Sequence, residues 1–185
     1  MAEYHISLPA KEQDIRRLRA GDTVYLSGTI FTMRDAAHEK ALFLLAEGKT
    51  LPVNLAEGAI YHCGPLMKKK GKKWEAVSAG PTTSARMEMF EDALMMKTGA
   101  RIIIGKGGMG SRTAQALQKL GGVFCAFTGG CGVLAANAIK MVEGVHWLEG
   151  LGMPEALWVF RVENFGPLVV AMDSQGKSLY DSSKK

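Results

Sequence analysis

The sequence predicts an α/β fold, a single domain with a mixed sheet and additional β structure at its flanks. First, helical and strand patterns alternate between residues 84 and 141, which is typical of βαβ units and a parallel sheet. Second, strand-like apolar segments follow near the C-terminus without helices between them. Third, 185 residues with a hydrophobic share of 47% and a charged share of 22% suit one packed domain rather than a disordered or fibrous chain.

The first half of the chain is predicted to contain two helices and three strands. β-Branched and aromatic residues after Asp22 indicate a strand, and alanines, leucines and charges after Arg34 indicate a helix that Gly48 ends as a left-handed cap. A lysine-rich connection then joins two strands that we expect to pair with each other. The predicted helices span residues 11–19 and 35–47, and the predicted strands span residues 23–32, 58–63 and 73–78.

The second half starts after Gly80 and Pro81 with the alternating pattern. The predicted helices span residues 84–98, 111–120 and 131–141, and the strands between them span residues 101–105 and 123–127. Two apolar strands, residues 157–162 and 168–173, are expected on either side of a turn at residues 164–167. A second turn at residues 174–176 leads to the last strand-like residues, and no internal repeat or long linker divides the chain.

Composition excludes several classes of protein. No apolar run reaches the roughly 18 residues of a membrane-spanning helix, and the N-terminus lacks the charged-then-apolar order of a signal peptide. We therefore expect a cytoplasmic protein. Cys63, Cys125 and Cys131 form no CxxC pair, and their odd number argues against a disulfide framework. Because an iron–sulfur cluster normally needs three or four thiolates, we interpret them as buried or half-buried thiols and expect no cluster on this chain alone.

The net charge of +5 is concentrated in one lysine-rich stretch, residues 68–73. Together with Trp74, this stretch could contact nucleic acid or a membrane surface. The alternative is a solvated hairpin tip, which is the more common role of such a run.

A glycine-rich loop, residues 105–110, joins a buried-type strand to a helix. Its glycines match G-x-G-x-x-G by letter, but no acidic residue stands at the end of the next strand to bind a ribose, which argues against a dinucleotide site. Lys106 precedes the later glycines instead of a helix-starting Ser or Thr, which argues against a P-loop. Close backbone approach, unpaired N–H groups at the helix start and the charge of Lys106 predict an anion site, the alternative being a tight turn with Lys106 in solvent.

A second strand-to-helix junction carries three consecutive hydroxyls, those of Thr82, Thr83 and Ser84. We expect one of them to cap the following helix and the others to be free for a ligand. Arg86 lies about one turn after Thr82, and its guanidinium can bind a carboxylate through two parallel hydrogen bonds. The alternative is a capped helix with a surface arginine.

A third junction carries Arg34 at a strand's end, with His38 one helical turn later. Ligand sites of α/β folds gather at the carboxyl ends of strands, so we expect Arg34, Thr82 with Arg86, and Lys106 to converge on one cleft. Several cations in one cleft predict a multiply charged small acid as ligand.

Five ordered motifs carry a family resemblance, namely TMRDAAH, IYHCGP, SAGPTTSARM, IIIGKGGMG and PEALWVFRVENFGPLVVAMDSQGKSLY. From about Leu8 to Tyr180 the chain resembles the β subunit of two-subunit class I fumarases and L-tartrate dehydratases, which are iron–sulfur-dependent hydro-lyases. The resemblance implies a swivelling β/β/α fold and one β-subunit-type domain over residues 1–185. It also implies a partner α subunit that holds a four-iron four-sulfur cluster, in an (αβ)₂ assembly.

The resemblance also implies roles for the residues singled out above. Arg34, Arg86 and Lys106, with Thr83, would bind the substrate carboxylates, and Thr82 would be the base that takes a proton from carbon. His38 and His62 would lie behind these residues, with packing as the alternative role of each. The implied reaction is the reversible conversion of fumarate and water to malate.

Two other functions remain as alternatives. Dehydration of L-tartrate is the alternative within the same family, since both substrates are dicarboxylates. A non-catalytic basic module that binds nucleic acid through residues 68–73 and Trp74 is the alternative from another class. Cys63 and Cys131 stand where the family is expected to have small residues, so no metal ligand is assigned to this chain.

Overall fold

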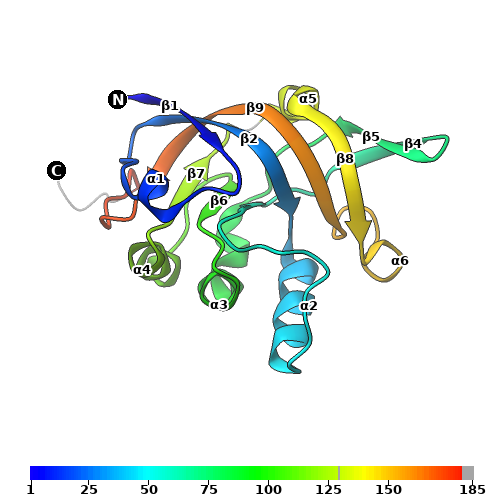
Figure 1. Ribbon diagram of the computed structural model, residues 1–185, viewed down its shortest axis with the longest axis horizontal. Helices are drawn as coiled ribbons and strands as arrows, with labels where there is room; N and C mark the ends of the chain where they lie inside the picture. The colour runs from blue at the N-terminus through cyan, green and yellow to red at the C-terminus, as the bar shows by residue number, and fades with distance from the viewer. Residues whose placement is uncertain (129, 181–185) are drawn as a thin grey trace.

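A computed structural model describes residues 1–128 and 130–180 of the chain, and its central feature is a seven-stranded mixed sheet (Figure 1). The strand order is β1-β2-β3-β6-β7-β9-β8, and β2 pairs a second time, with β9. This extra pairing closes β2, β3, β6, β7 and β9 into a barrel-like ring. The strands are β1 (Glu3–Ser7), β2 (Thr23–Thr32), β3 (Ala59–Tyr61), β6 (Ile102–Gly105), β7 (Val123–Ala126), β8 (Ile139–His146) and β9 (Leu157–Met172).

Strand direction decides where the functional residues gather. The pairs β1–β2, β2–β3, β3–β6 and β6–β7 are all parallel, so their carboxyl ends lie at one edge of the sheet. The long strand β9 runs antiparallel to β2, β7 and β8. The predicted mixed sheet of an α/β fold is confirmed.

Three helices lie side by side against one face of the sheet, namely α2 (Asp35–Ala46), α3 (Glu88–Thr98) and α4 (Ser111–Leu120) (Figure 1). Strand β6 shows how the two faces are used. Ile102 and Ile104 point into the ring, where they pack with Phe160 and Phe165, whereas Ile103 points to the helices and packs with Leu117. Burial on both faces explains why β6 is a continuous apolar run.

The remaining elements surround this body. They are the helices α1 (Glu12–Arg16), α5 (Gly132–Ala138) and α6 (Leu148–Leu151), the 3₁₀ helix η1 (Ser84–Met87), and a separate two-stranded hairpin of β4 (Leu66–Lys70) and β5 (Lys73–Ser78). The hairpin projects from one end of the molecule, away from the N-terminus (Figure 1). No helix in residues 1–128 and 130–180 is long and apolar enough to span a membrane.

Several predicted elements are confirmed, and one pairing is wrong. The strand at residues 23–32 and the helix at residues 111–120 have the predicted bounds, and Gly48 adopts the left-handed conformation, with φ at 69°. The two strands predicted to pair across the lysine-rich stretch lie in different sheets. The stretch is itself strand β4 and the hairpin tip, because Gly71, at φ 62°, reverses the chain between Lys70 and Lys73.

The chain after residue 131 differs most from the prediction. The predicted helix at residues 131–141 ends at Ala138, and the chain continues directly into β8. The two strands predicted on either side of residues 164–167 are one strand, β9, with an irregularity. Val162 and Phe165 lie three residues apart on β9, whereas their partners on β2, Gly28 and Leu26, lie only two residues apart. The extra residue on β9 makes the turn-type residues a β-bulge. The bulge lies where β9 exchanges β8 for β7 as its second neighbour.

Candidate active site

Three neighbouring strand ends supply the backbone of the candidate site. Arg34 follows β2, His62 follows β3 and Lys106 follows β6. Because β2, β3 and β6 are adjacent and parallel, these residues lie at the same edge of the sheet.

The segment that carries Thr82 lies between the ends of β3 and β6. Pro81 forms a bridge with Cys63 on one side, and Thr83 forms a bridge with Lys106 on the other. The Thr82 N–H donates to the His62 carbonyl at 2.7 Å, and the Lys106 N–H donates to the Thr82 carbonyl at 3.2 Å. The segment reaches this place as an inserted piece of extended chain, since the preceding strand β5 belongs to the separate hairpin.

Arg86 is tied to the beginning of α2. Its Nε and Nη2 donate to the two carboxylate oxygens of Asp35 at 3.2 and 2.8 Å, and Asp35 directly follows Arg34. The arginine side chain is 52% exposed, so a ligand can reach it. The structure thereby brings Arg86 to the same edge as Arg34.

Arg34 is more enclosed. Its Nη2 lies 3.1 Å from Glu155 Oε1, and the side chain is 19% exposed. Its Nε is buried and has no hydrogen-bond partner within residues 1–128 and 130–180. The guanidinium lies over Gly64, where a Cβ would come within 2.5 Å of Nη1, so only glycine leaves room for it.

The hydroxyls of the inserted segment do not act as predicted. Neither Thr82 nor Thr83 caps a helix, and Ser84 instead holds His62 Nδ1 at 2.9 Å and the Lys106 N–H at 3.2 Å. Thr82 is half-buried and Thr83 exposed, and the described part of the chain offers no hydrogen-bond partner to the Thr82 hydroxyl. That hydroxyl is therefore available to a ligand.

The glycine-rich loop does not offer the expected unpaired N–H groups. The Glu88 carboxylate of α3 accepts hydrogen bonds from the N–H groups of Gly110, Arg112 and Thr113 and from the Thr113 hydroxyl. A protein carboxylate thus occupies the start of α4, where an anion was predicted. Of the predicted anion site only Lys106, half-buried at the edge of β6, remains.

Beneath this edge lies a fully buried group of His38, His62 and Glu91, and Glu91 was not predicted. His62 Nε2 is 2.7 Å and His38 Nε2 3.3 Å from Glu91 Oε2. Burial alone would raise the pKa of Glu91, but the two imidazoles lower it to about 2. The sequence did contain a signal, because Glu91 shares the buried face of α3 with Leu94 and Met95 at helical spacing.

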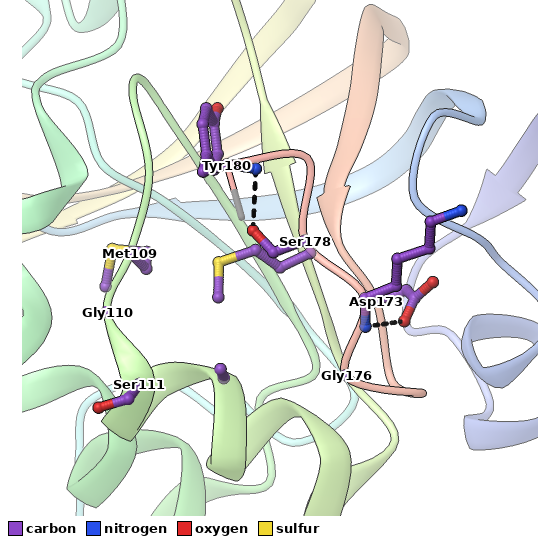
Figure 2. A pocket seen from close by; sticks show the side chains of 10 residues that line it. Met109, Gly110, Ser111, Asp173, Gly176, Ser178 and Tyr180 are labelled. Carbon is purple, nitrogen blue, oxygen red and sulfur yellow. Dashed lines mark hydrogen bonds between the residues drawn. The ribbon is translucent and has the colours of Figure 1, made fainter. Parts of the chain in front are cut away.

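A pocket of about 330 Å³ lies on the other side of the glycine-rich loop, between Met109–Ser111 and residues 172–180 (Figure 2). Its buried acid, Asp173, accepts hydrogen bonds from the backbone N–H groups of Gln175 and Lys177. None of the predicted site residues lines this pocket. It offers mainly apolar surface and is not the candidate site.

The three cysteines do not suit an iron–sulfur cluster. Cys63, Cys125 and Cys131 are buried and form no disulfide, and burial raises the pKa of each thiol, that of Cys125 to about 12. Within the described residues, the group with the spacing of metal ligands is His38, His62 and Glu91, without any thiol. The interpretation of the cysteines as buried thiols is confirmed.

Cationic side chains and an open hydroxyl at the carboxyl edge of a mixed α/β sheet are typical of proteins that bind small acids. Comparison with known proteins identifies the family. The family model described as Fumarase C-terminus matches residues 2–183, so the chain belongs to this family. The resemblance to class I fumarases and tartrate dehydratases is confirmed.

Individual relatives cover nearly the whole chain. The L(+)-tartrate dehydratase subunit beta of Escherichia coli (strain K12) is 46% identical over 180 residues, which is 97% of this chain and 88% of the relative. A putative L(+)-tartrate dehydratase subunit beta of Methanocaldococcus jannaschii is 47% identical over 94% of this chain and 89% of its own. A putative fumarate hydratase class I of Geobacillus stearothermophilus is 44% identical over 97% of this chain, which spans 34% of that longer protein.

Proposed function

We propose that the chain is the β-type subunit of a hydro-lyase that interconverts a 2-hydroxy dicarboxylate and its dehydrated product. Hydration of fumarate to malate is the reaction of first choice, and dehydration of L-tartrate to oxaloacetate is the alternative. The observation that carries the proposal is the arrangement at one sheet edge of Arg34, the inserted Thr82 segment and Lys106, with Arg86 tied beside them. Family membership over residues 2–183 supports the same reaction class.

In this proposal the cations bind and the threonine hydroxyl reacts. Arg34, Arg86 and Lys106 hold the substrate carboxylates, and the exposed Thr83 adds a hydrogen bond. Thr82 takes the proton from the carbon next to the departing hydroxyl. An alcohol is a weak base unless its alkoxide is stabilised, and nearby guanidinium and ammonium groups supply that stabilisation.

The proposal assigns the cofactor to a partner. The buried thiols of this chain do not suit an iron–sulfur cluster, so a partner α subunit would hold a four-iron four-sulfur cluster. The two kinds of subunit would form an (αβ)₂ assembly in the cytoplasm. When bound, the cluster supplies a Lewis acid for the departing hydroxyl. This chain supplies the residues that orient the carboxylates and hold the proton.

The nucleic-acid alternative finds little support in the hairpin. The Trp74 ring packs edge to face against Trp158 at 5.2 Å, so it is not free to stack on bases. Lys69 lies over the same ring, and Lys70 pairs with Glu75 at 3.3 Å. We propose neither a nucleic-acid nor a membrane partner.

The function is tested by reconstituting the chain anaerobically with its cluster-bearing α subunit and measuring turnover of fumarate and L-tartrate. The ratio of kcat/KM values decides the substrate. Thr82→Val keeps the shape and removes the hydroxyl, so kcat should fall by roughly 10²–10⁴-fold, the contribution of a positioned general base, while KM changes little. Thr50→Val, at an exposed loop position, is the matched control. A kcat for Thr82→Val within about threefold of the parent, below that range, would assign the base to another residue.

A further inference from the structure

His38, Glu91 and His62 form one connected buried group, to which we give the name imidazole–carboxylate cluster. All three side chains are fully buried, and their ligand atoms lie within 4.8 Å of one another. They come from three elements, since His38 lies on α2, Glu91 on α3 and His62 after β3. A buried carboxylate is costly unless it is paired, so the protonation of the two rings follows from their contacts.

The surroundings of His38 favour a proton on each ring nitrogen. Its Nδ1 lies 2.8 Å from the Arg34 carbonyl, which can only accept a hydrogen bond, so Nδ1 carries a hydrogen. Its buried Nε2 makes no hydrogen bond within residues 1–128 and 130–180 but lies 3.3 Å from Glu91 Oε2, so a neutral ring would face that carboxylate with a lone pair, whereas a charged ring pairs with it. This arrangement favours the imidazolium form of His38.

The contacts of His62 require only one proton. Ser84 Oγ accepts the Lys106 N–H, which leaves the serine hydrogen free to donate to His62 Nδ1. His62 Nε2 then carries the ring hydrogen and donates it to Glu91 Oε2 at 2.7 Å. With His62 neutral, the imidazolium of His38 balances the charge of Glu91.

The direction of each pKa agrees with these contacts. Burial opposes the charge of His38, but Glu91 outweighs it, with a smaller effect of Asp35 on α2, so the pKa of His38 is raised. For His62, burial is the stronger effect and the pKa is lowered in spite of Glu91. Glu91, His62 and Asp35 are the titratable groups that face His38, and the Phe90 ring of α3 stacks on it at 6.2 Å.

The cluster is connected to each segment of the candidate site. His38 holds the Arg34 carbonyl, and His62 holds Lys106 through Ser84. The His62 carbonyl also accepts the Thr82 N–H. A shift of Glu91 would therefore move three backbone segments that carry Arg34, Thr82 and Lys106.

We propose that His38, Glu91 and His62 are positioning residues, with one permanently held proton on His38, that fix the three segments in register for dicarboxylate binding. The part that concerns the substrate rests on the proposed function, whereas the held proton does not. The cluster touches no substrate in this proposal and acts through the backbone of Arg34, Thr82 and Lys106.

The held proton is tested on the chain alone by long-range ¹H–¹⁵N spectra of the histidine rings between pH 5.5 and 8.5. We expect His38 to keep the shifts of an imidazolium and His62 those of a neutral ring protonated at Nε2 throughout. The exposed ring of His5 is the internal reference for a solvent-accessible imidazole. Neutral shifts for His38 would overturn the assignment, as would stoichiometric zinc in the dialysed chain that is lost on His38→Ala.

The positioning role is tested by Glu91→Gln, which keeps the shape and removes the charge. We expect His38 to lose its held proton, KM for the dicarboxylate in the assembled enzyme to rise about tenfold or more because Arg34 and Lys106 shift, and kcat to fall as well because the segment of Thr82 shifts. Glu39→Gln, exposed on the helix that carries His38, is the matched control. An unchanged KM together with a deprotonated His38 would overturn positioning. If Glu91→Gln does not fold, the spectra of the parent chain still decide the held proton, and an inactive parent enzyme would contradict the proposed function instead.

Discussion

Replacing Gly105 with alanine places a methyl group where the Ser84 hydroxyl lies. Gly105 is the last residue of β6, and a Cβ built there falls 1.8 Å from Ser84 Oγ and 3.1 Å from His62 Nδ1. Ser84 is fully buried, so its hydroxyl has no open space to enter. Rotation of the serine removes the clash only by breaking its bonds to His62 and Lys106.

The magnitude follows from the bonds that must break. Two hydrogen bonds, at 2.9 and 3.2 Å, are lost, and each contributes about 0.5–1.5 kcal/mol net. The Lys106 N–H keeps the Thr82 carbonyl as acceptor, but His62 Nδ1 is left buried without a partner, which adds to the loss, so we expect the free energy of unfolding to fall by about 2–4 kcal/mol. With a urea dependence of about 2 kcal/mol per molar, the unfolding midpoint should fall by about 1–2 M.

Urea unfolding of the chain, followed by tryptophan fluorescence, measures this change. Gly144→Ala in β8 is the matched control, because the nearest atoms to its Cβ lie at 3.9 Å, and we expect a change below about 0.5 kcal/mol there. In a Ser84→Ala background the effect of Gly105→Ala should shrink, because the clashing oxygen is absent. Equal losses for Gly105→Ala and Gly144→Ala, or no relief from Ser84→Ala, would refute this reasoning.

Three further predictions follow from single contacts. Arg86→Lys keeps the charge but cannot hold both Asp35 oxygens, so KM in the assembled enzyme should rise about tenfold with stability changed by less than about 1 kcal/mol, because the pair is exposed. Glu88→Gln removes the charge that accepts four hydrogen bonds at the start of α4, and urea unfolding should show a loss of about 1–2 kcal/mol. The pKa of Glu91, lowered from 4.5 to about 2, makes its stabilising contribution complete above about pH 4.5 and lost as the pH falls toward 2, so acid should lower the urea midpoint more in the parent than in Glu91→Gln.

The sequence predicted correctly those helices and strands whose ends are determined by residues close by in the chain. The strand at residues 23–32 and the helix at residues 111–120 are bounded by polar and glycine residues that act within one or two positions. The closure of the ring could not be predicted in this way, because the pairing of β2 with β9 joins segments more than 120 residues apart. The β-bulge of β9 shows the same limit, since the pairing of its flanking residues with the distant strand β2 keeps β9 one strand although Asn164, at φ 48°, has a turn-type conformation.

In the candidate site, too, some placements follow from local sequence and others depend on distant parts of the chain. Arg34 and Lys106 could be placed together because parallel neighbouring strands bring their carboxyl ends together, although their roles stay predictions. Thr82 was expected there as the end of a strand, whereas its segment arrives as an insertion between β3 and β6 and not at the end of a strand of the main sheet. The anion site at the start of α4 was wrong because Glu88, 22 residues before Gly110, occupies it.

The cations of the site are already paired within the chain, and this limits how a dicarboxylate can bind. Asp35 uses Nε and Nη2 of Arg86, which leaves Nη1 to a ligand, and Glu155 uses Nη2 of Arg34. If these cations bind the substrate as proposed, it must share the remaining donors or replace one of these carboxylates, and replacement gains little because one carboxylate is exchanged for another. Lys106 has no acidic partner within residues 1–128 and 130–180, so it is the cation most open to a new charge. The pairing of Arg34 and Arg86 therefore implies that the chain alone binds a dicarboxylate weakly. The affinity should rise strongly when a partner subunit adds its own hydrogen-bond donors.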